Sequence, residues 1–321
     1  MKHYIIRNII DKKKDKYIHE YTDKRGNVLL KKCYSEYING LYIPPAYDKV
    51  KINKNNSDKI LAISEDSKGR KQYTYNKEYI QEATDNKYKK IIEFGNNYKC
   101  IMNRINKDMT SFEDSKKKQV AMILKLIDEC NFRVGNEKYT KENNSYGVCT
   151  LKNEHIKITK DGIIVDFIGK EGVRNRCRVK NKRLAKNLKT RKKTLKKDDR
   201  IFNYRSKHKY YNVSAPDVNR YLKQFGNFSA KNFRTWTANI ELIQLLLKNK
   251  ESNLKKNVSM CIKKISERMH HTPSICKKNY INKDLLDVYI NKHNIFNRYF
   301  TKTTKEEISE EFILFLKGIY H

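Results

Sequence analysis

The sequence predicts an α+β fold, with a small β-rich N-terminal domain and a larger, mainly helical domain that carries a three-stranded antiparallel sheet. Residues 1–82 consist mostly of short strand patterns separated by turns. Apolar residues at helical spacing begin near residue 83 and continue toward the end of the chain. A length of 321 residues is enough for two domains, so we expect them at 1–82 and 83–321.

The chain is strongly basic. Its 71 Lys+Arg residues against 36 Asp+Glu give a formal net charge of +35, while 38% hydrophobic residues suffice for a core. Such an excess of cations indicates a polyanionic partner, most simply nucleic acid. Residues 178–200 hold many of these cations and are interpreted as a solvated face near phosphates, with no role assigned to any one of them.

The seven cysteines are scattered, with no CxxC spacing and none at zinc-ligand distance from a pair of histidines. This pattern predicts a reducing compartment and neither a disulfide framework nor a metal site. The first residues contain no apolar stretch typical of a signal peptide. No run approaches the ~18 apolar residues of a membrane helix. We therefore expect a soluble, intracellular protein without a membrane partner.

The N-terminal strands are expected at residues 17–21 and 28–33, on either side of a hairpin turn at 23–27, and then at 50–52 and 59–63. The next segment, Asp66–Tyr75, is a short basic loop that leads into alternating Gln and Tyr. It can present phosphate donors and aromatic faces to a DNA groove, although an ordinary solvated turn is the simpler alternative. The candidate DNA contacts in it are Lys68, Arg70, Gln72, Tyr73 and Tyr75.

Helices are predicted around residues 91–105 and 120–130, the second of which delivers Arg133 and has Gly135 available to stop it. Residues 148–179 indicate a three-stranded meander, with its first strand at either 148–151 or 156–158 and with Lys170 at a hairpin tip. Such a lysine is either a solvated charge or a probe for a DNA groove. Further helices are expected at 217–225, 234–248, 258–269 and within 284–321.

The segment His271–Tyr280 is the centre of the functional prediction. Thr272 suits a helix N-cap and Pro273 a first helical residue, so a helix should begin there and carry Tyr280 two turns later. A histidine, a helix N-terminus and a phenol over ten residues can form a phosphate site with a nucleophile. Lys231 and Arg234 begin another helix, whose positive N-terminus could face the same phosphate.

The chain lacks the sequence signatures of several cofactor sites. It has no phosphate loop, no zinc pattern and no cluster of paired carboxylates. We therefore expect neither ATP nor a metal ion as cofactor.

Taken together, these segments resemble the type IB DNA topoisomerases of the small poxvirus, giant-virus and bacterial kind. The matching motifs keep their order over roughly residues 40–281. They are Ile43-Pro-Pro-Ala-Tyr47, Asp66–Tyr75, Arg133-Val-Gly135, Thr150-Leu-Lys-Asn-Glu-His-Ile156, Phe167-Ile-Gly-Lys170, Lys231-Asn-Phe-Arg234 and His271-Thr-Pro-Ser274 followed by Tyr280. Glu171 stands where poxvirus members usually carry Asp, and Val134 where Phe is common; neither change alters the charges of the site.

The resemblance implies a function and a set of roles. It implies that the protein relaxes supercoiled duplex DNA through a 3′-phosphotyrosyl intermediate, without cofactors. Tyr280 would be the nucleophile, and Arg133, Lys170, Arg234 and His271 would complete the catalytic site. Tyr139 and Lys231 join the candidate DNA contacts. The two domains would close as a monomeric clamp on duplex DNA, and a viral member would act in the host cytoplasm and be carried in the virion.

Two other functions fit parts of the pattern. A tyrosine recombinase uses the same Arg/Lys/Arg/Tyr chemistry, but typically has His-x-x-Arg where this chain has Lys231-x-x-Arg234, and requires oligomeric synapsis. A non-enzymatic DNA-packaging protein would explain the charge, but has no use for ordered site residues.

Overall fold

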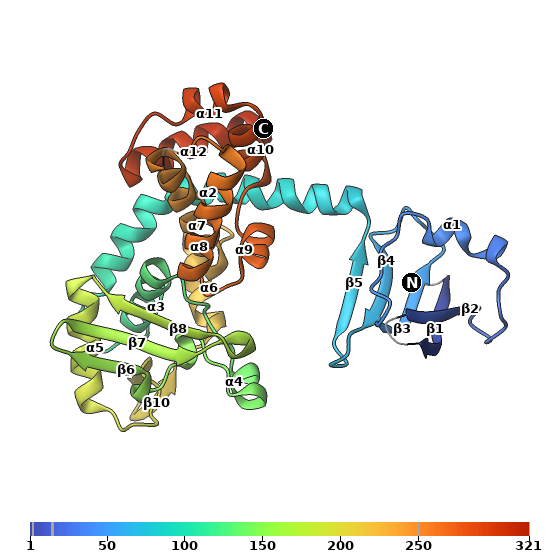
Figure 1. Cartoon of the computed structure of the whole chain (residues 1–321). Coiled ribbons are helices and arrows are strands. Elements are labelled where there is room, and N and C mark those ends of the chain that lie inside the picture. Colours follow the sequence, from blue (N-terminus) through green and yellow to red (C-terminus); the bar gives the residue numbers. More distant parts are fainter. Residues whose placement is uncertain (2, 14–15, 250, 321) are drawn as a thin grey trace. The chain divides into compact units, whose positions relative to one another are not determined.

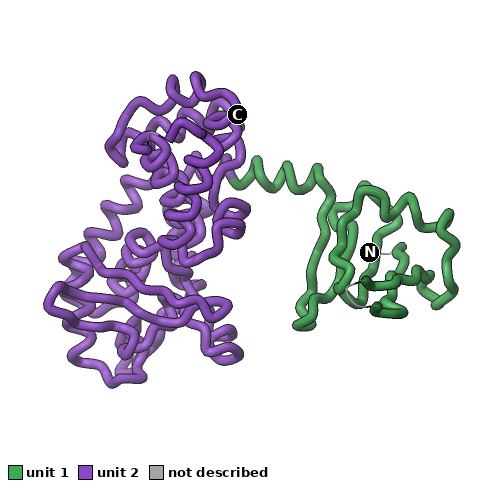
Figure 2. Tube along the Cα trace, in the orientation of Figure 1, with its two compact units in different colours: residues 1–87 green, residues 88–321 purple. Residues whose placement is uncertain are grey.

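The computed structural model describes the chain except for residues 2, 14, 15, 250 and 321 (Figure 1). The chain divides into two compact units, residues 1–87 and residues 88–321 (Figure 2). The division falls within the long helix α2 (Lys77–Asp108), as does the boundary expected from the sequence after residue 82. Each unit has its own cluster of buried apolar side chains.

The first unit, residues 1–87, is built on a five-stranded antiparallel sheet in the order β2-β1-β3-β4-β5, which confirms the predicted β-rich region. Its core is small: Ile5, Ile43, Val50, Ile52 and Ala62. The elements are β1 (Tyr4–Lys13), β2 (Lys16–Thr22), α1 (Ser35–Ile38), β3 (Asp48–Asn53), β4 (Ile60–Glu65) and β5 (Lys71–Tyr75), followed by the first turns of α2.

One predicted strand of this sheet is wrong. Residues 28–33 do not form the second arm of a hairpin: Val28 makes an isolated bridge to Thr22, and Lys31–Cys33 is a 3₁₀ turn. The antiparallel partner of β2 is β1. Val28 is 64% exposed and the turn Lys31–Cys33 contains no buried side chain, whereas β1 buries Ile5 completely.

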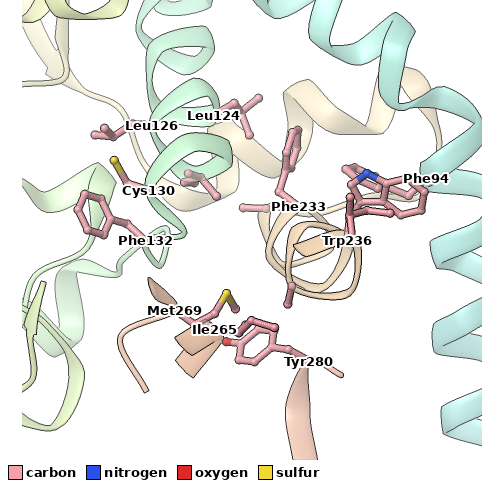
Figure 3. Packing of buried hydrophobic residues seen from close by; sticks show 14 of the residues in the cluster. Phe94, Leu124, Leu126, Cys130, Phe132, Phe233, Trp236, Ile265, Met269 and Tyr280 are labelled. Atoms are coloured by element: carbon pink, nitrogen blue, oxygen red, sulfur yellow. The ribbon is translucent and has the colours of Figure 1, made fainter. Parts of the chain in front are cut away.

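The second unit, residues 88–321, is mainly helical, as predicted. Its aromatic centre packs Phe94 of α2 against Phe233 and Trp236 of α7 (Figure 3). Besides the rest of α2, its helices are α3 (Lys116–Cys130), α4 (Glu137–Asn143), α5 (Lys182–Thr194), α6 (Ala215–Leu222), α7 (Ala230–Lys248), α8 (Leu254–Arg268), α9 (Pro273–Asn279), α10 (Lys283–Asn291), α11 (His293–Tyr299) and α12 (Lys305–Tyr320).

The predicted three-stranded antiparallel sheet is present as β6 (Ile156–Thr159), β7 (Gly162–Ile168) and β8 (Arg174–Val179), in that order. Residues 148–150, an alternative position for its first strand, form a 3₁₀ turn instead. The basic run beyond residue 178 contains helix α5, whose Leu184 and Leu188 are buried while most of its cations are exposed. A short hairpin, β9 (Asn203–Ser206) and β10 (Lys209–Asn212), follows and was not predicted.

The expectation of no disulfide is wrong for one pair of cysteines. Cys130, the last residue of α3, is bonded to Cys177 in β8, with 5.8 Å between their Cα atoms. The two are 47 residues apart in sequence, so their spacing carries no sign of the bond. Packing of the end of α3 against β8 brings them together.

Among the described residues, no helix is long and apolar enough to cross a membrane.

Candidate active site

Arg133 lies in an extended segment directly after α3. The helix ends at Asn131, which adopts the left-handed conformation at φ 55°. The sequence prediction that Gly135 stops the helix is therefore wrong, since asparagine tolerates this conformation nearly as well as glycine.

Gly135 has a different role, in the packing of the Arg133 segment. It crosses Gly147 so closely that a Cβ on Gly147 would lie 2.4 Å from Cα of Gly135. The backbone of Arg133 is fixed at this crossing, because its carbonyl accepts a hydrogen bond of 2.9 Å from the N–H of Val148. Side chains at either glycine would separate the two segments and displace Arg133.

His271 and Tyr280 lie at the two ends of α9. Thr272 is the N-cap, its hydroxyl accepting from the N–H of Ile275, and Pro273 is the first helical residue, as the sequence predicts. Tyr280 is the C-cap residue, with φ −120°, so it ends the helix rather than continuing it. This short helix therefore holds the imidazole and the phenol on one side, with their ring centroids 5.3 Å apart.

Arg234 projects from the first turns of α7 into the protein interior and is only 4% exposed. Its Nη1 donates a hydrogen bond of 2.6 Å to the hydroxyl oxygen of Tyr280, and its Nη2 donates one of 2.9 Å to the carbonyl of Met269. The guanidinium carbon lies 4.7 Å from the centroid of the Tyr280 ring. Figure 3 shows the ring of Tyr280 beside Met269 and Ile265.

Four of the five predicted catalytic residues are thus brought together from three separate parts of the second unit. Nη2 of Arg133 lies 2.9 Å from Nε2 of His271 and 3.1 Å from Nδ1, and donates to the ring. Nε2 of His271 lies 3.3 Å from the hydroxyl oxygen of Tyr280. The hydroxyl of Tyr280 is therefore surrounded by Arg234 and His271, with Arg133 behind the histidine.

The charges of this pocket follow from its burial. Burial, and then the positive charge of Arg133, lowers the pKa of Arg234 to about 10, while the nearby Tyr280 opposes the change. Burial, followed by Arg133 and Arg234, lowers the pKa of His271 to about 3. At neutral pH the pocket therefore contains two guanidinium cations and a neutral imidazole.

Neither arginine has a carboxylate partner in an ion pair among the described residues. The Nε of Arg234 is also buried, and it has no hydrogen-bond partner among the residues that the structure describes. Burying a cation such as Arg234 without a counter-charge is costly, so such a pair of arginines is expected where an anion binds. Two guanidinium groups match the oxygens of a phosphate in geometry as well as in charge.

Lys170, the fifth predicted catalytic residue, is not in contact with the other four. It lies in the turn between β7 and β8, as predicted, with its side chain 62% exposed and its Nζ 3.8 Å from Glu171. Its positive charge contributes weakly to the low pKa of His271. The turn places Glu171 and Gly172 at φ 63° and 73°.

Asn239 is a residue of the site that the sequence reasoning missed. It is fully buried on α7, where its amide donates 2.8 Å to the carbonyl of Tyr280 and its Oδ1 accepts 2.8 Å from the N–H of Asn282. The asparagine therefore fixes the backbone on both sides of Ile281 and so positions the phenol. A polar residue on the apolar face of a predicted helix is the only sign of it in the sequence.

The two other predicted DNA contacts of this unit are exposed. Lys231 lies in the first turn of α7, three residues before the buried Arg234. Tyr139 is 58% exposed on α4, which begins two residues after Gly135. In the described part of the chain, neither side chain forms a hydrogen bond or an ion pair with the four assembled residues.

The predicted contacts of the first unit surround Asp66. Its carboxylate accepts from Nε of Arg70 at 2.8 Å and from Nε2 of Gln72 at 2.9 Å, while the backbone N–H of Lys68 donates to it at 2.9 Å. Hydrogen bonding, led by Arg70, lowers the pKa of Asp66 to about 2. The aspartate thus organises the loop, and the side chain of Lys68 stays exposed.

Tyr73 and Tyr75 lie on β5, an edge strand of the sheet, and are 45% and 37% exposed. Their rings stack 6.2 Å apart, and Tyr75 also contacts Tyr79 at the start of α2. We call Tyr73 and Tyr75 the tyrosine face. Alternation along a strand explains why both point to the same side.

Among the described residues, no group of three or more His, Cys, Asp or Glu side chains is arranged so that it could hold a metal ion. The expectation that the protein needs neither metal nor ATP stays a prediction.

Comparison with known proteins identifies the family. The model of the family described as eukaryotic DNA topoisomerase I, catalytic core, matches residues 76–307. The DNA topoisomerase 1B of Acanthamoeba polyphaga mimivirus is 33% identical over 301 residues, covering 89% of this chain and 88% of that protein. The DNA topoisomerase 1B of vaccinia virus (strain Copenhagen) and the DNA topoisomerase I of monkeypox virus are each 31% identical over 255 residues, covering 78% of both chains. The chain belongs to the type IB DNA topoisomerase family.

Proposed function

We propose that this protein relaxes supercoiled duplex DNA by cutting one strand with Tyr280, allowing rotation, and rejoining the strand. Membership of the family supports this function. The observation that carries the mechanism is the pair of arginines around the hydroxyl of Tyr280, neither of which pairs with a carboxylate of the described residues. Such a pocket suits a phosphodiester, whose charge both guanidinium groups can share.

Tyr280 attacks the phosphorus atom in line with the 5′-oxygen. A bond forms between the phenolic oxygen and phosphorus, and the bond from phosphorus to the 5′-oxygen breaks. The hydrogen bond of 2.6 Å from Arg234 stabilises the phenolate that attacks. His271 is close enough to accept the phenolic proton, but a ring with a pKa of about 3 is a weak base. We therefore assign the proton to solvent and a hydrogen-bonding role to His271.

Negative charge grows on the non-bridging oxygens as the transition state forms. Arg133 and Arg234 can each offer directional donors to these oxygens, and neutral His271 one more. Arg234 is buried and already fixed by Met269 and Tyr280, so little reorganisation is needed when charge develops. This arrangement could serve the purpose that a metal ion serves in other phosphoryl-transfer sites.

The leaving 5′-oxygen requires a proton, and Lys170 is our candidate donor. Its side chain is exposed at the tip of the β7–β8 hairpin, so it can reach DNA that lies across the pocket. Because the phosphotyrosyl bond conserves the energy of the phosphodiester, rejoining needs no ATP.

We further propose that the protein works as a monomer, with the first unit holding the duplex through Lys68, Arg70, Gln72 and the tyrosine face, and the second through Tyr139 and Lys231. Its net charge of +35 supports duplex DNA as the partner. Since the relatives named above include viral proteins, we propose the host cytoplasm, and the virion, as its locations.

The test is incubation of the purified protein with supercoiled plasmid in a chelator and without ATP. We expect both positive and negative supercoils to be relaxed. An absolute requirement for magnesium or ATP would contradict the mechanism. Formation of recombinant products by a tetramer, instead of relaxed circles, would favour the tyrosine recombinase alternative.

A further inference from the structure

The disulfide between Cys130 and Cys177 is not used by the proposed mechanism. It joins the last residue of α3 to the middle of β8, two elements that both lead toward catalytic residues. The other five cysteines are free, three of them buried and two exposed. The pair therefore differs from the rest of the cysteines in chemistry and in position.

On the side of α3, the disulfide lies directly behind the pocket. Arg133 follows Cys130 by three residues, and the carbonyl of Cys130 is 3.3 Å from Nε2 of His270. His270 precedes His271 in the chain. Phe132, which lies between Cys130 and Arg133 in the sequence, packs on His270, with ring centroids 5.2 Å apart. A displacement of Cys130 would therefore reach both Arg133 and His271 through short, direct connections.

On the side of β8, the disulfide holds the hairpin that presents Lys170. Cys177 pairs with Val165 of β7, and the same ladder continues to Ile168 and Arg174, next to the turn. The base of the hairpin is thereby bonded to the end of α3, while the tip with Lys170 stays exposed. One covalent bond thus connects the Arg133 segment to the strand pair that carries the candidate proton donor.

The disulfide also borders a cavity. Cys130 and Cys177 both line a cavity of about 840 Å³, together with His270, Arg176 and Lys180. Cys177 is half-buried, whereas Cys130 is only 4% exposed. A dithiol would therefore approach the bond from the side of Cys177.

We propose that Cys130 and Cys177 form a reversible oxidation site that sets the geometry of the catalytic pocket. This inference rests on the proposed function. A dithiol reductant breaks the S–S bond through a mixed disulfide; two thiols form on the protein, and the reductant becomes a disulfide, so two electrons and two protons are transferred. The reverse exchange uses a small-molecule disulfide as the oxidant, which re-forms the protein disulfide and is itself reduced to thiols. The oxidised protein holds Arg133 and the Lys170 hairpin in fixed relation, and the reduced protein allows them to move apart.

Reduction should slow catalysis without abolishing the fold. Phe132 stays packed on Phe167 of β7, with ring centroids 4.9 Å apart, so α3 and the sheet keep a non-covalent contact. Small displacements of catalytic groups are nevertheless expensive in rate, and we expect single-turnover cleavage by the reduced protein to be roughly tenfold slower. The bond also constrains the unfolded chain, so its loss should lower the melting temperature by roughly 5–10 °C.

The experiment compares full-length protein after mild oxidation and after treatment with a dithiol. Alkylation and mass spectrometry count the free thiols, with five expected in the oxidised state and seven in the reduced one. Single-turnover cleavage of a DNA duplex is then measured in both states. Cys130→Ser and Cys177→Ser should cleave at the slow rate in either state. Cys100→Ser, an exposed position on α2, should stay sensitive to the reductant.

Three results would overturn the inference. They are seven free thiols after oxidation, equal cleavage rates in the two states, and faster cleavage by the reduced protein. Failure of the proposed function would look different: neither state would cleave DNA, while the thiol count and the shift in melting temperature would still report the disulfide.

Discussion

Tyr280 in the second unit and the tyrosine face in the first carry the same phenol in opposite surroundings. Tyr280 is 6% exposed, and its hydroxyl accepts a hydrogen bond of 2.6 Å from a buried arginine. Tyr73 and Tyr75 are 45% and 37% exposed on an edge strand; their rings stack on each other, and Tyr75 also contacts Tyr79. The first arrangement fixes an oxygen, and the second leaves rings available.

The difference separates the two requirements of a DNA-cutting enzyme. Stabilising a transition state requires donors that are already in place, which burial and a dense hydrogen-bond network provide. Binding a long polyanion requires accessible charge and rings, which exposed residues provide. Changes in the pocket should therefore lower cleavage and spare binding, whereas changes on the tyrosine face should alter binding and site choice.

Tyr280→Phe should have the largest effect. Removing the hydroxyl eliminates the nucleophile, so no relaxation of supercoiled plasmid is expected, while DNA affinity in a gel-shift assay stays close to that of the unmutated protein. A cost of about 1–3 kcal/mol in unfolding free energy is expected as well, because Arg234 loses a buried acceptor. Relaxation by the purified variant would show that another residue attacks DNA.

Lys170→Ala should have the next largest effect. If the lysine protonates the leaving 5′-oxygen, cleavage of ordinary DNA should slow by roughly 100- to 10,000-fold. When sulfur replaces the 5′-bridging oxygen of the substrate, the released strand leaves as a thiolate and needs little protonation. Single-turnover cleavage of that substrate by Lys170→Ala should therefore approach the unmutated rate.

Arg234→Ala is the matched control for this substrate, because the sulfur does not change the non-bridging oxygens that the arginine is proposed to contact. Its cleavage defect should persist on both substrates. If Lys170→Ala cleaves the sulfur substrate as slowly as ordinary DNA, the role of the lysine is to contact a phosphate or a groove. Arg133 then becomes the next candidate for the proton donor.

Tyr73→Ala and Tyr75→Ala should have smaller, sequence-dependent effects. Losing one ring contact is expected to weaken cleavage at a preferred site by roughly 5- to 100-fold, if the ring stacks on DNA. Cleavage at random sites should fall less. Tyr42→Ala, a 77% exposed tyrosine in the same unit but outside β5, should change neither. An equal loss on all sequences would reduce the tyrosine face to a packing feature.

Mild acid should have the smallest effect and should act through the second unit. Burial lowers the pKa of His155 and of His270 to about 4, and that of His271 to about 3. The ordinary pKa of histidine is 6.5, so below pH 6.5 these rings bind protons in the unfolded chain but stay neutral in the folded protein. The free energy of unfolding therefore falls as the pH drops from 6.5 toward 4. In the first unit, the hydrogen bonds to Asp66 favour folding above pH 3.8 and are lost only toward pH 2.

Trp236, the one tryptophan of the chain and fully buried, reports unfolding of the second unit. The urea midpoint from its fluorescence should be lower at pH 5 than at pH 7. His155→Gln, which cannot gain a proton, should show a weaker dependence on pH. An unchanged or higher midpoint at pH 5 would mean that these histidines are protonated in the folded protein.

Parts of the fold that depend on local signals were predictable from the sequence. The N-cap at Thr272 with Pro273 placed the start of α9. Apolar segments separated by Gly-containing turns placed the β6–β8 sheet and Lys170 at its tip. The prediction of a strand at 28–33 was wrong because the composition of a turn does not show which neighbouring segment packs its side chains into the core.

Features that depend on contacts distant in sequence could not be predicted. The role of Gly135 depends on Gly147 crossing it, and Asn239 acts through a backbone 41 residues away. The disulfide joins cysteines on a helix and a strand whose packing no spacing rule describes. For the assembled pocket, the resemblance named the residues, but the burial of Arg234 and the low pKa of His271 come only from the packed structure.

The most direct test of the account is to identify the atom that becomes bonded to DNA. A duplex labelled at the 5′ end of the cut strand, with a short leaving strand that dissociates, traps the covalent complex. After digestion with trypsin, we expect the label on the peptide Asn279–Lys283, whose one tyrosine is Tyr280, and a 5′-hydroxyl on the released strand. A label on any other peptide, or a free 3′-hydroxyl at the cut, would contradict the assignment of Tyr280 as the nucleophile.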